Sequence, residues 1–277
     1  MTTLTNLPRI SSLAITTALL LSACSAASEP LGNETLSAAK AATKQVETLC
    51  QYNPEKTSKP NPLGMRTFVR LSSRDGDVTA TYEQLPSLVS AAPVPVTRAL
   101  TRYLFLPARS IASARELLLQ RNDLWEELIG YKDSEGFAQV NEVLSCEDKE
   151  AATSSHLSLT EKGPVQQPTC AYDPDSGVPN PLGMRHFVTI FDGQANDSAG
   201  STEVAFVNEQ FQYLVDADLP AAAAYTVTLS VFDTRLEDAR SLVLSNGSRL
   251  GNELLSENGQ DGSGSILSEI NASLRCK

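Results

Sequence analysis

Alternation of apolar and polar residues predicts the strands of this chain, and it is clearest in the C-terminal half. Residues 226–231 (Thr-Val-Thr-Leu-Ser-Val) alternate without a break, as expected for a half-buried β-strand. Residues 186–191 and 203–207 are rich in β-branched and aromatic side chains and predict two further strands. Apolar residues then recur at helical spacing from residue 236 until Asn246-Gly247, and a last helix is expected from about residue 265.

The N-terminal half has a similar order of expected elements. Residues 68–71 and 78–82 flank Asp75-Gly76, a dipeptide that favours the tight turn of a β-hairpin. Residues 103–106 predict a third strand, and residues 110–129 predict one long helix with an apolar face. Each half therefore has the pattern of an α+β unit, in which helices pack on one face of an antiparallel sheet.

An internal repeat divides the chain. The segment Pro-Asn-Pro-Leu-Gly-Met-Arg occurs at residues 60–66 and again at residues 179–185, in both places after a cysteine and before the first expected strand. Seven consecutive identities are too many for chance, and a period of about 120 residues suits a duplicated domain better than a solenoid repeat. We therefore predict two homologous domains, residues 50–146 and 170–277, joined by a polar linker at residues 147–169.

The cysteines support the same division. Apart from Cys24 there are four, and they lie at the two ends of each copy: Cys50 and Cys146, Cys170 and Cys276. Four cysteines allow three pairings, but only pairing within each copy gives two equivalent domains the same bridge. We therefore predict that each domain is a small antiparallel sheet with helices on one face and one internal disulfide, Cys50–Cys146 or Cys170–Cys276.

The N-terminus has the features of an export signal. The apolar run at residues 13–21 is preceded by Arg9 and is too short for a membrane-spanning helix, which needs about 20 apolar residues. The residues that follow, Leu21-Ser22-Ala23-Cys24, resemble the lipobox of bacterial lipoprotein precursors. The resemblance covers this motif alone, and no family is recognised for the body of the chain.

The lipobox resemblance implies that residues 1–23 are a signal peptide and that Cys24 carries the lipid. Residues 24–49 would then form a tether and an N-terminal helix. Ser25 stands where the enterobacterial sorting pattern has Asp in lipoproteins kept at the inner membrane, so the resemblance implies an outer-membrane location facing the periplasm. The alternative is ordinary cleavage after Ala26, which would release a soluble periplasmic protein.

Composition and charge exclude two classes of function. The chain has 277 residues with 22 basic and 33 acidic side chains, and a formal net charge of −11 argues against nucleic acid as a partner. A single short apolar segment excludes a polytopic transporter. The charge is uneven, because residues 50–146 have 11 basic and 11 acidic side chains while residues 170–276 have 5 and 15. Either arginines of the first domain face the acidic second domain, or the two domains present different surfaces to different partners.

The repeated segments contain the candidate site residues, Asn61 and Arg66 in the first copy and Asn180 and Arg185 in the second. A turn fixed by proline and glycine could present the arginines to an anionic ligand, or the arginines could bind carbonyl groups or an acid of their own domain. The chain contains no sequence motif of a known hydrolase, zinc protease or nucleotide-binding protein, so no catalytic residue, metal site or cofactor is predicted.

These observations favour a lipid-anchored, non-enzymatic binding or scaffold protein of the bacterial cell envelope. Its expected partners are the membrane, through the anchor, and an envelope protein. The alternative is an envelope hydrolase with an acidic cleft between the domains, built from residues such as Glu203, Asp233 and Glu237.

Overall fold

The computed structural model describes residues 46–91, 94–133, 135–150, 167–193, 202–216, 218–256 and 265–277, which belong to one compact unit, Thr43–Lys277. We call residues 46–150 the first half and residues 167–277 the second half. The first half contains β1 (Val46–Tyr52), β2 (Thr67–Arg74), β3 (Asp77–Ser90), β4 (Val96–Leu106), α1 (Ile111–Gln120), α2 (Asn122–Ile129), α3 (Ala138–Val143) and β5 (Leu144–Glu150). The second half contains β6 (Cys170–Tyr172), a 3-10 turn (Pro174–Ser176), β7 (His186–Gly193), β8 (Glu203–Leu214), β9 (Ala222–Phe232), α4 (Leu236–Val243), α5 (Arg249–Leu255), α6 (Ser265–Ser273) and β10 (Leu274–Cys276).

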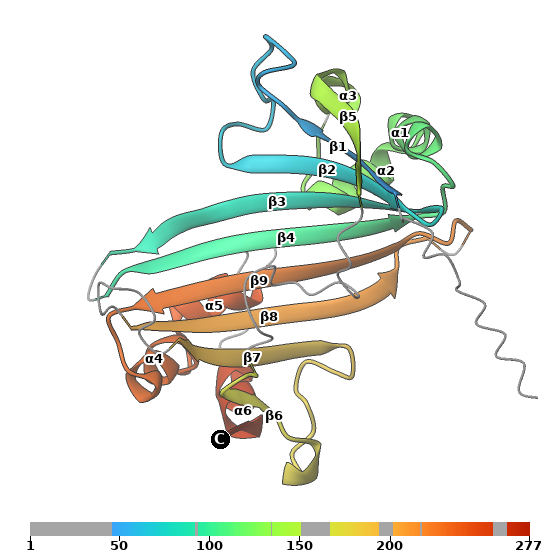
Figure 1. The fold of residues 1–277 in the computed structure, drawn as a ribbon. Coiled ribbons are helices and arrows are strands. Elements are labelled where there is room, and N and C mark those ends of the chain that lie inside the picture. Colours follow the sequence, from blue (N-terminus) through green and yellow to red (C-terminus); the bar gives the residue numbers. More distant parts are fainter. Residues whose placement is uncertain are drawn as a thin grey trace, which may run out of the picture. The chain divides into compact units, whose positions relative to one another are not determined.

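All ten strands of the described residues form one antiparallel sheet, in the order β10-β6-β7-β8-β9-β4-β3-β2-β1-β5 (Figure 1). The α+β class predicted from the sequence is thus confirmed. Two separate sheets are not what the structure contains, because β4 pairs with β9 over ten residues, from Val96 opposite Val231 to Phe105 opposite Ala222. Backbone groups that would lie at an edge of each smaller sheet are paired here with the other half.

The strand order is symmetric about the seam between β4 and β9, since five strands of one half mirror five of the other. Thr101 on β4 lies opposite Thr226 on β9. Each of these threonines also lies opposite a glutamate of the next strand, Glu83 on β3 and Glu209 on β8. The register therefore relates the two halves by an approximate two-fold axis through the Thr101–Thr226 pair, and residues related in this way are called corresponding residues below.

One face of the sheet is covered by the helices. Side chains that alternate along the strands, such as Leu71, Tyr82, Leu104, Phe206 and Leu229, are fully buried in one apolar cluster with residues of the helices of both halves. In Figure 1 strands β8 and β9 are drawn in front of α5, so the view is onto the opposite face. We call that opposite face, on which no described helix packs, the open face.

Two arginines of the first half contact the second half. Arg98 on β4 donates through Nε to the carbonyl of Glu253 at 2.9 Å, and through Nη2 to the carbonyl of Ser256. Arg121 forms an ion pair with Asp216 at 2.6 Å. Charged side chains thus contribute to the contact between the halves. Most of that contact, however, consists of the continuous strand pairing and the shared apolar cluster.

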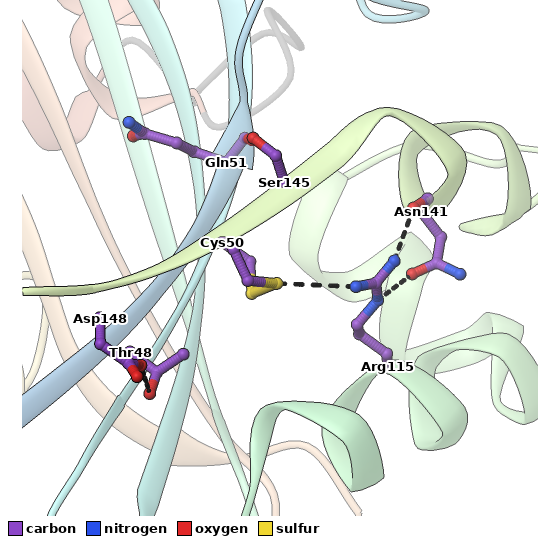
Figure 2. The surroundings of a disulfide bond; sticks show 8 residues. Thr48, Cys50, Gln51, Arg115, Asn141, Ser145 and Asp148 are labelled. Carbon is purple, nitrogen blue, oxygen red and sulfur yellow. Dashed lines mark hydrogen bonds between the residues drawn. A yellow bond between two sulfur atoms is a disulfide. The ribbon is translucent and has the colours of Figure 1, made fainter. Parts of the chain in front are cut away.

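The two predicted disulfides, Cys50–Cys146 and Cys170–Cys276, are confirmed. Each joins directly opposite residues of an outer strand pair, β1·β5 or β6·β10. Figure 2 shows Arg115 beside the first bridge, with its guanidinium donating to the side chain and carbonyl of Asn141 and to Sγ of Cys146. Arg240 makes the corresponding contacts with Asn271 and Cys276 in the second half.

Local expectations differ from the structure at several places. The predicted N-terminal helix is wrong from residue 46 to residue 49, because β1 forms there and pairs with both β2 and β5; the rest of that expected helix and residues 24–45 of the tether lie outside the described residues. The single helix at residues 110–129 is two helices, because Arg121 leaves the helical region with φ −117° and ψ 81°. In the predicted linker, residues 147–150 continue β5, and residues 151–166 lie outside the described part of the chain.

Candidate functional site

The two repeated segments form the same turn. Asn61 donates through Nδ2 to the carbonyls of Gly64 at 2.8 Å and Thr67 at 2.7 Å, and its Oδ1 accepts the N–H of Leu63 at 3.1 Å. Asn180 makes the same three contacts in the second half, at 2.6, 2.8 and 3.1 Å. Both asparagines therefore stabilise the turn that leads into the sheet.

The arginines of these segments bind backbone groups of the neighbouring strand. Arg66 donates to the carbonyl of Pro86 on β3, and Arg185 donates through Nη1 to the carbonyl of Gln212 on β8 at 2.8 Å. Both side chains remain exposed. These contacts are the ones expected if each arginine binds carbonyl groups of its own half.

A pocket of about 480 Å³ lies on the open face, where β4, β9 and β8 run side by side. Residues of both halves line it, so it spans the seam. The residues whose chemistry matters most are Tyr103, Phe105, Arg185, Glu209, Phe211 and Thr226.

Glu209 is the acidic residue of this pocket, and it is half-buried. Removal from water disfavours the carboxylate, so burial raises the pKa of Glu209 above its usual range. Burial also raises the pKa of Tyr103 to about 12, with a smaller lowering by Arg70 and smaller increases from Glu83 and Glu209. The Tyr103 side chain is therefore a neutral phenol at neutral pH.

Thr226 lies at the floor of the pocket. It is only 8% exposed, and its hydroxyl has no hydrogen-bond partner in the described part of the chain. A buried hydroxyl without a partner is unfavourable, so the floor offers a polar group that a ligand can satisfy.

His186 lies on the opposite, helix-covered side of the sheet. Its Nε2 is 2.6 Å from Oδ1 of Asn208 and 3.3 Å from the hydroxyl of Tyr225. Burial lowers the pKa of His186, with a smaller increase from the hydrogen bond to Asn208, so the ring is neutral at neutral pH. Because Glu209 points to the open face, the structure does not bring this histidine and this acid together.

The three acids considered for a hydrolase lie at the corner where β8 begins and β9 ends. Glu203 is the first residue of β8, Asp233 follows β9, and Glu237 is in the first turn of α4. Asp233 and Glu237 are exposed, and none of the three lines the open-face pocket.

Exposed large apolar side chains of the described residues recur at corresponding positions. Met65 and Met184 are 92% and 93% exposed in the repeated segments. Near them, two further corresponding pairs are exposed at the ends of β3 and β8: Leu85 and Leu88 in the first half, and Phe211 and Leu214 in the second. Backbone hydrogen bonds connect each methionine segment to its strand, since the N–H of Leu85 donates to Arg66 and the N–H of Phe211 donates to Arg185, at 2.8 Å each.

Sequence reasoning missed Glu209, Phe211 and the pocket. The signal that identifies this site is a difference in residue type between corresponding positions of the two halves. These positions can be matched only when the strand registers are known. Cys24 and the lipobox lie outside the described residues.

Comparison with known proteins provides no relative, because no protein family, no curated protein and no solved structure matches the chain. Among the described residues no helix is long and apolar enough to cross a membrane, and no group of three His, Cys, Asp or Glu side chains is arranged to hold a metal ion.

Proposed function

We propose that this chain is a lipid-anchored, non-enzymatic binding protein of the bacterial cell envelope, built from two copies of one α+β unit and binding its partner on the open face. The lipobox at residues 21–24 supports the anchor and an outer-membrane location facing the periplasm. The two disulfides are consistent with an oxidising compartment outside the cytoplasm, although they are weaker support for it than the export signal.

The observation that carries the proposal is the pairing of exposed apolar side chains. Met65, Leu85 and Leu88 have exposed counterparts at Met184, Phe211 and Leu214, although the two halves differ strongly in charge. Single exposed apolar residues are common on proteins, but apolar groups gathered near one another favour an interaction site. Methionine and aromatic residues are also enriched in protein interfaces. We infer that the open face has two related contact regions for an envelope protein.

The pocket chemistry favours binding over hydrolysis. Acid-base hydrolysis by carboxylates commonly uses two acids that flank the scissile bond, whereas Glu209 is the acid that lines this pocket. His186 is hydrogen-bonded to Asn208 and Tyr225 on the other face of the sheet, so it does not act together with Glu209.

A photo-crosslinking experiment in intact cells tests the binding face. A benzoylphenylalanine is placed at Met184 or Leu214 on the proposed contact regions and, as the control, at Leu119 on α1, which is 48% exposed on the helix-covered side. We expect one discrete protein adduct from the first two positions and none from Leu119. No adduct, or the same adducts from all three positions, would contradict the proposal.

The anchor has its own test. Radioactive palmitate should label the wild-type chain in bacteria and should not label the Cys24→Ala variant. Fractionation should place the wild type with the outer membrane. Labelling that persists in the variant would rule out lipidation at this residue.

A further inference from the structure

The two halves differ in one ion pair on the open face. In the first half, Arg70 on β2 binds Glu83 on β3, with Nη2 and Oε2 2.5 Å apart. The corresponding glutamate of the second half is Glu209, and the residue that corresponds to Arg70 is Thr189. A threonine cannot supply the positive charge. No hydrogen bond or ion pair of the Glu209 side chain is formed within the described part of the chain.

We propose that the open-face pocket is a binding site for an organic ammonium ion, which pairs with Glu209 and supplies the positive charge that Arg70 supplies to Glu83 in the first half. The inference deepens the proposed function, since it assigns a ligand class to the open face of a binding protein. The burial of Glu209 strengthens it, because a half-buried carboxylate without a partner is unfavourable and a bound cation removes that penalty.

The walls of the pocket suit an organic cation. Tyr103 and Phe105 lie side by side along β4 with ring centroids 6.5 Å apart, and Phe211 contributes a further aromatic ring from β8. Aromatic faces attract ammonium groups through the ring quadrupole, and cages of aromatic side chains with an acid are a common way to hold them. The unsatisfied Thr226 hydroxyl adds an acceptor at the floor for a ligand N–H or O–H.

Other ligand classes fit less well. Calcium and magnesium need about six or more oxygen ligands and are commonly held by carboxylates, whereas Glu209 is the one carboxylate among the described residues that line the pocket. An anion would have to approach Glu209. Arg185 also lines the pocket, but its side chain is exposed, so water screens its positive charge more than it screens the half-buried carboxylate of Glu209. The volume of about 480 Å³ is within the range of small-molecule pockets.

Titration calorimetry of the full chain in detergent micelles tests the proposal. The probes are choline, the lysine derivative Nα-acetyl-lysine methylamide, and 3,3-dimethylbutanol, which has the shape of choline without its charge. We expect choline or the lysine derivative to bind at least tenfold more tightly than the neutral alcohol. Preference for choline points to a free or lipid-borne quaternary amine, and preference for the lysine derivative points to a side chain of a partner protein. Binding of neither cation, or equal binding of the alcohol, would overturn the proposal.

Variants at corresponding positions provide matched controls. Glu209→Gln should weaken cation binding at least tenfold, while Glu83→Gln, which removes the paired glutamate of the first half, should leave it unchanged. Thr189→Arg should abolish binding because it supplies the arginine that the first half has. Phe211→Leu, which installs the residue found at position 85, should weaken binding several-fold.

The melting curve of each variant, followed by far-UV circular dichroism, separates loss of binding from loss of folding. If the Glu209→Gln variant is folded and binds as the wild type does, the assignment of Glu209 is wrong. If no cation binds but the crosslinks from the open face persist, the ligand class fails and the proposed function stands.

Discussion

The continuous sheet predicts that the two halves unfold together. The prediction can be tested by creating a cavity in the second half and following unfolding with a fluorescent residue of the first half. Trp125 is the single tryptophan of the chain, is fully buried in α2, and donates through Nε1 to Asp133 at 2.8 Å. Its fluorescence therefore reports unfolding of the first half. Ile190 on β7 of the second half is 0% exposed and lies between Cys170 and Phe206 in the sheet.

Replacing Ile190 by alanine should lower the free energy of unfolding by about 3 kcal/mol, within the range of about 2 to 5 kcal/mol for a large buried aliphatic side chain. With a urea dependence of about 3 kcal/mol/M for a chain of this size, the midpoint should fall by about 1 M. If β4 and β9 couple the halves, Trp125 fluorescence and far-UV circular dichroism should show this same shift.

Leu71→Ala is the matched variant, because Leu71 corresponds to Ile190, lies on β2 of the first half and is also 0% exposed. Both variants should give one coincident transition with a similar shift. The reasoning fails if Ile190→Ala leaves the Trp125 midpoint where it is in the wild type while circular dichroism shows an early partial transition. That result would mean that the halves unfold as separate units.

Three further predictions use other parts of the fold. In urea denaturation, Gly64→Ala should cost about 1 kcal/mol of stability from its positive φ alone, because residue 64 faces open space. Gly130→Ala should cost more, because a Cβ at residue 130 would also lie 2.2 Å from the buried guanidinium of Arg102. Equal losses would contradict this. His186→Thr, which installs the residue of position 67, should make the stability of the protein less sensitive to acid. The folded-state pKa of His186 is lowered, so below about pH 6.5 the unfolded chain binds the proton more readily than the folded chain, and the wild type loses stability. The wild-type melting temperature should therefore fall more than that of the variant between about pH 7.5 and pH 5.5. Replacing both cysteines of one bridge by alanine should lower the free energy of unfolding by at most about 4.7 kcal/mol. The loss should be nearly the same for the two bridges, since the loops of 96 and 106 residues are similar in length. Chemical denaturation of the two double variants measures both losses, and a difference of several kcal/mol between them would refute the prediction.

Local signals explain what the sequence could predict. The alternation at residues 226–231 lies inside β9, and Asp75 and Gly76 adopt the positive φ values, 54° and 87°, that their turn requires. The disulfide pairing followed from the positions of the cysteines at the ends of the two copies. Each of these inferences depends on residues close in sequence or on the repeat itself.

Long-range pairing and edge position explain what it could not. Residues 147–150 are Glu-Asp-Lys-Glu, and this charged sequence indicates a solvated linker. Charged side chains also protect the edge strands of natural sheets from further pairing, and β5 is such an edge strand. β4 begins at Val96, seven residues before the strand expected from residue 103, because its N-terminal part is stabilised by β9 and not by local propensity. The pocket depends on that same pairing and has no signature of its own.

The seam between β4 and β9 also determines how assembly depends on concentration. A chain that ended after β5 would leave β4 as an uncovered edge, and two such chains could pair their β4 strands about Thr101 to restore a ten-stranded sheet. That association would be second order and would weaken on dilution. In the present chain both strands belong to one polypeptide, so the effective concentration of one half for the other is in the millimolar range. Formation of the sheet is therefore first order and independent of how little protein the cell makes, and each half is free to differ in sequence from its counterpart, as Arg70 and Thr189 do.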